Sequence, residues 1–180
     1  MKSEVIVLCE GSTDETFIRR FLILRGYSHR QIRLTRHSKG QGSGEQFVRA
    51  NFPAELHEIR RWQAKGLIAM LDGDGKTPAM RKQQLDAACD AAGVPRRKPG
   101  EAAVIAVPCR NIETWFMYLH GEPWTETEDY SKQNRDVLAA AAAVRLHDMC
   151  YKQQHLAEPA PDSLADACEE WKRFKKSNQG

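Results

Sequence analysis

Short runs of apolar residues alternate with amphipathic, helix-spaced segments over the first two-thirds of the chain. Three of these runs, Val5–Cys9, Leu67–Leu71 and Ala102–Val107, are continuous and apolar, as in strands that are buried on both faces. A fourth segment, Gln31–Thr35, alternates apolar and polar residues, which is typical of a more exposed strand. Because strands alternating with helices favour a parallel sheet with right-handed crossovers, we expect an α/β fold with helices flanking the sheet.

Capping signals indicate where the first helices begin and end. Ser12 as N-cap and Glu15 at the third helical position fit a capping box, and Gly26 is placed to end that helix. The glycine-rich segment Lys39–Gly44 predicts a loop, and a helical segment follows it. We expect Pro53 to interrupt this second helix, because proline lacks the backbone N–H that a helix interior needs.

Two further helices are predicted after the third and fourth strands. Thr77 as N-cap with Pro78 at the first position opens a helix that runs towards Gly93. Asn111 can cap the next helix, which Gly121 closes. The apolar positions of that helix have the spacing of a face packed on a sheet, and they are Ile112, Trp115, Phe116 and Leu119.

Beyond Gly121 the pattern changes from strand-and-helix alternation to helices alone. An alanine-rich helix is predicted over Val137–Met149, and a proline-containing linker follows it. The last segment is an amphipathic helix with its apolar residues at Leu164, Ala167, Cys168, Trp171 and Phe174. We therefore expect an α/β domain over residues 1–121 and a helical extension over residues 122–180 packed on it.

The composition is that of a soluble globular protein, with 41% apolar and 28% charged residues. No apolar run is long enough to span a bilayer, and no signal peptide opens the chain, so we expect a cytoplasmic protein without membrane contact. The cysteines are scattered without C-x-x-C spacing, and we expect them to be reduced thiols. They are Cys9, Cys89, Cys109, Cys150 and Cys168.

The formal charge is only +3, but basic residues are unevenly distributed. The stretch from Thr16 to Gly44 has no carboxylate and contains Arg19, Arg20, Arg25, Arg30, Arg33, Arg36 and Lys39. Further basic clusters lie at Arg60–Arg61, Arg96–Lys98 and Lys172–Lys176. They fit a phosphate-backbone ligand and solvated helix faces equally well.

Carboxylates follow the predicted strands at the points where the strands end. Glu10 ends the first strand, and Asp72 and Asp74 end the third. Glu113 lies in the first turn of the helix after the fourth strand, and Asp14 opens the first helix. Since the carboxyl ends of parallel strands share one edge, these groups converge there, and a hard divalent cation such as Mg²⁺ would neutralise them.

The motifs at these strand ends resemble those of the Toprim domain. Cys9–Asp14 is similar to its glutamate motif, and Leu71–Gly75 is similar to its Asp-x-Asp motif. Topoisomerases, bacterial primases, recombination mediators, an RNA-maturing nuclease and OLD-family nucleases share this domain. The Glu-Gly-x-Thr-Asp form, together with Arg110–Trp115, is most similar to OLD-like and small stand-alone Toprim proteins, many of them encoded among prokaryotic defence genes. The resemblance implies a Rossmann-like parallel sheet over the first two-thirds of the chain.

The resemblance also implies roles for the carboxylates. Asp72 and Asp74 would bind Mg²⁺ or Mn²⁺, with Glu10 as a metal ligand or a general acid/base. Asp14 and Glu113 would be ligands of a second ion, as in two-metal OLD sites. For Glu113 an alternative is a favourable charge at a helix N-terminus.

The activity implied is hydrolysis of nucleic-acid phosphodiester bonds, with DNA rather than RNA as the expected ligand, in anti-phage defence or DNA repair. Lys76 or Arg110 would stabilise charge on the phosphate. OLD proteins carry an ATPase that this sequence does not resemble, so the implied partners are a separately encoded ATPase and a second copy in a homodimer.

Two other functions remain open. Asp72–Thr77 also resembles the nucleophile loop of haloacid-dehalogenase-type phosphatases, although Glu128-Asp129 has no strand before it to supply the second acidic pair. The third hypothesis is a non-catalytic Toprim scaffold that binds nucleic acid or a partner ATPase.

Overall fold

The computed structural model describes residues 4–35, 37, 42–61, 66–130 and 135–177, with the backbone alone at residues 135 and 173–177. Four strands form one parallel sheet in the order β2-β1-β3-β4. They are β1 Val5–Cys9, β2 Ile32–Thr35, β3 Gly66–Met70 and β4 Ala103–Ala106. The predicted α/β fold with a parallel sheet is confirmed, with strand ends within a residue or two of the expected ones.

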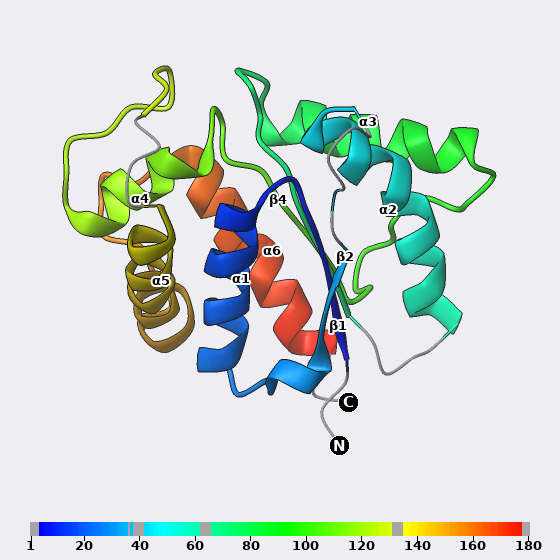
Figure 1. The fold of residues 1–180 in the computed structure, drawn as a ribbon, viewed down its shortest axis with the longest axis horizontal. Coiled ribbons are helices and arrows are strands. Elements are labelled where there is room, and N and C mark those ends of the chain that lie inside the picture. The colour runs from blue at the N-terminus through cyan, green and yellow to red at the C-terminus, as the bar shows by residue number, and fades with distance from the viewer. Residues whose placement is uncertain (1–3, 36, 38–41, 62–65, 131–134, 178–180) are drawn as a thin grey trace.

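Helices cover both faces of the sheet and give three layers (Figure 1). One layer holds α1 Ser12–Leu24, α4 Ile112–His120, α5 Arg135–Leu146 and α6 Asp162–Ser177. The opposite layer holds α2 Gly44–Arg61 and α3 Pro78–Ala91. A short 3₁₀ turn, η1 His29–Gln31, precedes β2, and a π-helical segment, η2 His147–Gln153, continues α5.

Alternate residues of the strands supply two cores, one on each face of the sheet. Val5 and Val7 of β1 face the layer with α1, where Phe21 and Trp115 are almost fully buried. Leu8 of β1 faces α2 and α3 on the other side. Each large apolar side chain buried in this way contributes about 1.5–3 kcal/mol, so both layers are held firmly to the sheet.

The strand order places a topological switch point between β1 and β3. The chain leaves β1 for β2 on one side, then crosses to β3 on the other side of β1. Cys9 at the end of β1 is paired in register with Met70 at the end of β3. In open parallel sheets a ligand crevice forms at such a point, beyond the carboxyl ends of the two strands.

Two local predictions are wrong. Pro53 does not interrupt α2, which is continuous from Gly44 to Arg61, because Val48, Phe52 and Leu56 bury the helix against the sheet on either side of the proline. The first helix is capped by Gly11 rather than Ser12, since the Asp14 side chain accepts a hydrogen bond from the Gly11 backbone N–H at 3.3 Å.

The expectation of reduced cysteines is wrong for Cys150 and Cys168. They form a disulfide between η2 and α6, with Cα atoms 5.9 Å apart. Their separation of 18 residues gives no signal in the sequence, and the pair forms because α6 lies beside η2 in the fold. Cys9, Cys89 and Cys109 are free thiols.

The segment after Gly121 packs on the α/β core through α5 and α6. The small residues Ala139, Ala142 and Ala143 of α5 belong to the same buried cluster as α1, and Leu164 and Trp171 of α6 join it. The side chain of Phe174, expected on this face, lies outside the described residues. In the part of the chain that the structure describes, no helix is long and apolar enough to cross a membrane.

Candidate functional site

Glu10 lies directly beyond β1 and is joined to the loop after β3. Its Oε1 accepts a hydrogen bond from the backbone N–H of Asp72 at 2.8 Å. The first residue of α2, Gly44, packs against its other side, where a β-carbon would stand 2.6 Å from the Glu10 Cβ. Only a glycine therefore lets the N-terminus of α2 lie this close to the Glu10 side chain.

Burial and neighbouring charge disfavour ionisation of both carboxyls in this crevice. Burial raises the pKa of Glu10 to about 7, against the lowering effect of the Asp72 N–H. Burial also raises the pKa of Asp72, and the negative charges of Asp14 and Glu10 raise it further. Without a counter-ion this site holds protons, since clustered carboxylates cannot all be charged at low cost.

Asp14 and Glu113 complete a ring of carboxylates around one cavity. They are 6% and 5% exposed, which is unusual for acidic side chains. A cavity of about 230 Å³ is lined by Glu10, Asp14, Asp72 and Glu113, together with Gly11, Ser12, Thr13, Gly44 and Ile112. Four of the five carboxylates expected at this edge therefore share a single cavity.

Asp74 points elsewhere, contrary to the expected convergence of all five groups. It is an exposed residue with a left-handed backbone (φ 50°) that turns the loop after β3. Its Oδ2 accepts from Arg81 Nη2 at 3.0 Å, and it does not line the acidic cavity. Backbone hydrogen bonds join this loop to the loop after β4, with the Gly73 N–H donating to the Pro108 carbonyl at 2.7 Å.

Arg81 of α3 is the charged residue that the sequence analysis missed. It is 3% exposed. Its Nε donates to the Asp72 carbonyl at 3.0 Å, and its Nη1 lies 3.1 Å from Glu45 of α2. Arg81 thus connects the loop after β3 with the start of α2, and its position four residues before the buried Leu85 is the signal that could have revealed it.

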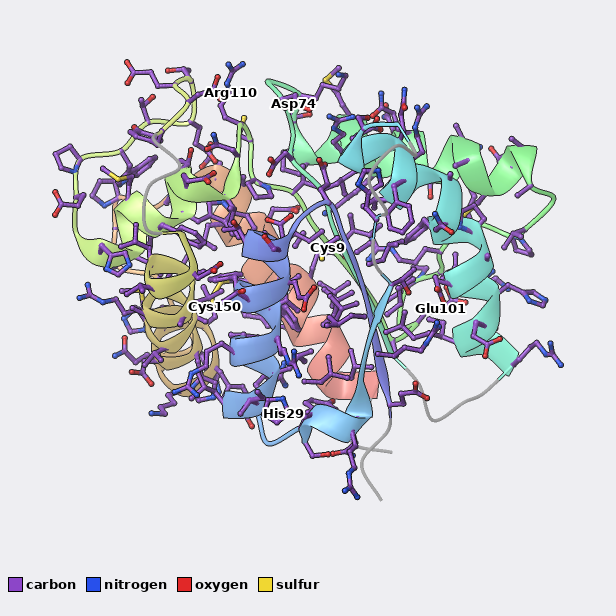
Figure 2. All side chains as sticks on the ribbon, viewed as in Figure 1. Cys9, His29, Asp74, Glu101, Arg110 and Cys150 are labelled. Carbon is purple, nitrogen blue, oxygen red and sulfur yellow. A yellow bond between two sulfur atoms is a disulfide. The ribbon has the colours of Figure 1, made fainter. Side chains whose placement is uncertain are left out.

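The two cations proposed to act on phosphate are Lys76, in the loop after β3, and Arg110, in the loop after β4. Neither lines the acidic cavity. Arg110 Nη1 stands 3.0 Å from where a β-carbon at position 75 would be, and its Nη2 is 2.8 Å from Asp129. Figure 2 shows Arg110 and Asp74 at the same upper edge of the molecule. Lys76 is partly buried in the loop beside them.

The donor set suits a hard divalent cation, although the side chains do not stand at coordination distances. Among the described residues, no three His, Cys, Asp or Glu side chains are close enough to hold a metal ion. The cavity nevertheless offers only oxygen ligands. Asn111, at the N-cap position of the adjoining helix α4, has a buried Oδ1 with no hydrogen-bond partner in the described part of the chain. A cation in this cavity would therefore need the carboxylates to stand closer together than they do.

The basic residues form fewer free patches than their distribution along the sequence suggests. Arg33 pairs with Glu55 at 2.6 Å, and Arg60 pairs with Glu101 at 2.8 Å. Arg25 stacks over the Tyr151 ring at 4.7 Å, and Arg97 pairs with Glu170. Arg36, Lys39 and the side chains of residues 173–176 lie outside the described residues. Much of the described positive charge therefore has a partner within the protein.

The class of protein that the fold and site define is a parallel α/β protein with an acidic cavity at its switch point. No family model, curated protein or solved structure matches the chain.

Proposed function

We propose that this chain is a divalent-metal-dependent nuclease of Toprim type that hydrolyses phosphodiester bonds in nucleic acid, with DNA favoured over RNA. The observation that carries the proposal is the cavity lined by Glu10, Asp14, Asp72 and Glu113 where β1 and β3 end. Four acidic side chains gathered at this point are unfavourable as anions, and a cation that neutralises them takes the place of the protons they otherwise hold. The resemblance of the two motifs to Toprim sequences supports phosphodiester chemistry in particular.

In this proposal the carboxylates hold Mg²⁺ or Mn²⁺. Asp72 serves one ion, and Asp14 and Glu113 serve a second. Asp74, which pairs with Arg81 outside the cavity, would have to turn towards Asp72 to join the first ion. Bound ions supply positive charge to the phosphate and lower the pKa of a water molecule. Glu10 is a ligand or moves the proton, and it does so through Oε2, because Oε1 already accepts from the Asp72 N–H.

Arg110 and Lys76 are the proposed cations on the substrate side of the loop. The exposed upper edge where Arg110 lies would admit a phosphate backbone (Figure 2). Because Asp129 now pairs with Arg110, substrate phosphate would have to displace that carboxylate. The resemblance further supports a cytoplasmic role in anti-phage defence or DNA repair, with a separate ATPase or a second copy of the chain as partner.

Plasmid cleavage tests the proposal. Purified protein is incubated with supercoiled DNA, and in parallel with RNA, in Mg²⁺, Mn²⁺ or EDTA. We expect metal-dependent nicking or linearisation of DNA that Asp72→Asn slows by about 100-fold or more. Asp136→Asn, at an exposed position of α5, is the matched control and should cleave normally. Cleavage that survives in Asp72→Asn would overturn the proposal.

Non-catalytic binding of nucleic acid is the second candidate. It is favoured by the spacing of the carboxylates, since no three described side chains stand close enough to hold a metal. This candidate predicts that the protein slows the migration of DNA in a gel but does not cleave the plasmid when metal is added. It also predicts that Glu10→Ala slows the DNA as much as the wild type does.

A further inference from the structure

A second hollow adjoins the acidic cavity on the other side of the turn that carries Glu10. It has a volume of about 340 Å³ and lies beside the carboxyl ends of β1 and β2. Its lining includes Glu10, Ser12, Glu15, Leu34, Thr35 and His37. The turn Glu10-Gly11-Ser12 lines both hollows, so ligands in the two would be neighbours.

His37 has an unused hydrogen-bonding nitrogen beside this hollow. Its Nε2 is buried and has no hydrogen-bond partner among the described residues. The ring is held against Phe47 with centroids 5.3 Å apart. The Thr35 hydroxyl, in contrast, already donates to Glu55 at 2.9 Å. A buried ring nitrogen without a partner is unfavourable, and a ligand that reached it from the hollow would relieve it.

The charges on the wall decide which ligand fits. Glu10 and Glu15 would repel a second phosphate, whereas the Glu15 carboxylate can accept a hydrogen bond from an amino group. Leu34 provides an apolar surface for a flat ring. A neutral heterocycle with a donor group satisfies all three features, whereas an anion would be repelled by the two carboxylates.

We propose that this hollow binds a nucleobase with an exocyclic amino group, belonging to the nucleotide next to the phosphate in the acidic cavity. The inference rests on the proposed function, because it takes the ligand of the acidic cavity to be nucleic acid. Cytosine and thymine provide a direct comparison, since cytosine has an exocyclic amino group where thymine has a carbonyl. In this proposal His37 Nε2 hydrogen-bonds the same base edge as the carboxylate, so His37 contributes to base preference without touching the reacting phosphate.

Fluorescence anisotropy with labelled single-stranded oligo-dC and oligo-dT tests this inference, with Ca²⁺ replacing Mg²⁺. We expect the full-length protein to bind oligo-dC at least about fivefold more tightly than oligo-dT. His37→Ala should remove that preference, and His37→Gln, which keeps a donor and an acceptor, should retain part of it. His57→Ala, at an exposed position of α2, is the control and should bind like the wild type.

Equal affinity of the wild type for the two oligonucleotides, binding of neither, or an unchanged preference in His37→Ala would each overturn the inference. A thermal melt of each variant separates loss of binding from loss of folding. If His37→Ala does not fold, the base preference of His37→Gln is measured in its place. The proposed nuclease function is judged separately by Asp72→Asn in the plasmid assay. A wild type that shows no base preference but cleaves DNA in an Asp72-dependent way would therefore refute the subsite alone.

Discussion

The carboxylate of Glu10 and the backbone of Asp72, distant in sequence, are joined by one hydrogen bond of 2.8 Å. This bond bridges the ends of β1 and β3, the two strands on either side of the switch point. It fixes one oxygen of Glu10 and brings the acidic groups of two separate loops to the same cavity.

Removal of divalent cations should make stability depend on pH between about pH 4.5 and about pH 7. Burial raises the pKa of Glu10 from its ordinary 4.5 to about 7, so the folded state binds that proton more tightly than the unfolded chain. The stabilisation is complete below pH 4.5 and is lost as the pH rises through 7, a change of about 3 kcal/mol. Urea unfolding in EDTA measures it.

Glu10→Gln should reduce that pH slope, whereas Glu122→Gln, at an exposed turn, should leave it unchanged. Some slope should remain in Glu10→Gln, because burial raises the pKa of Asp72 as well. A wild-type stability that increases over this pH range would contradict the prediction.

Arg81→Gln should lower the free energy of unfolding by about 3 kcal/mol, because it leaves Asp74 and Glu45 without their buried partner. Arg49→Gln is the matched control. Arg49 pairs with the same Glu45 at 3.2 Å, but its side chain is 44% exposed, so the loss should stay below about 1 kcal/mol. Similar losses in the two variants, measured by urea unfolding, would show that burial of Arg81 is unimportant.

Gly44→Ala should disturb the acidic cavity through steric contact alone. The added β-carbon would stand 2.6 Å from Glu10 Cβ, which forces α2 or Glu10 to move and costs about 1–3 kcal/mol. Gly11→Ala is the control, because its β-carbon meets nothing within 4 Å. We also expect Mn²⁺ to raise the melting temperature less in Gly44→Ala than in Gly11→Ala. Identical melting curves for the two variants, both with and without Mn²⁺, would contradict the steric role of this contact.

Thiol titration in denaturant should detect three reactive cysteines before reduction and five afterwards, since two of the five form the disulfide. Reduction, or Cys150→Ser, should lower the free energy of unfolding by about 3 kcal/mol, because the bond closes a loop of 18 residues. Cys89→Ser should leave the disulfide intact. Five reactive thiols in the unreduced protein would exclude the bond.

The positions of Glu10 and Asp72 could be predicted because they depend on local patterns. Each acid follows a continuous apolar run, and the ends of such runs in a parallel sheet share one edge. Gly26, Thr77 and Gly121 likewise mark helix ends where they were predicted, since caps are set by neighbouring residues.

The remaining features depend on contacts between distant segments. The orientation of Asp74 is set by Arg81, a residue on the following helix, and nothing near Asp74 in the sequence indicates it. The closeness of Gly44 to Glu10 requires the packing of α2 on the sheet. The continuity of α2 through Pro53 has the same cause, because tertiary burial outweighs a local preference.

The location of Mn²⁺ in crystals of the full chain, measured by anomalous scattering, tests the central claim most directly. We expect a peak inside the cavity lined by Glu10, Asp14, Asp72 and Glu113, with carboxylate oxygens drawn in to about 2.1 Å from the ion. Crystals of Asp72→Asn grown in the same way should lose that peak. The absence of a peak in the wild-type cavity, or a peak that persists in Asp72→Asn, would contradict the assignment of this cavity as a metal site.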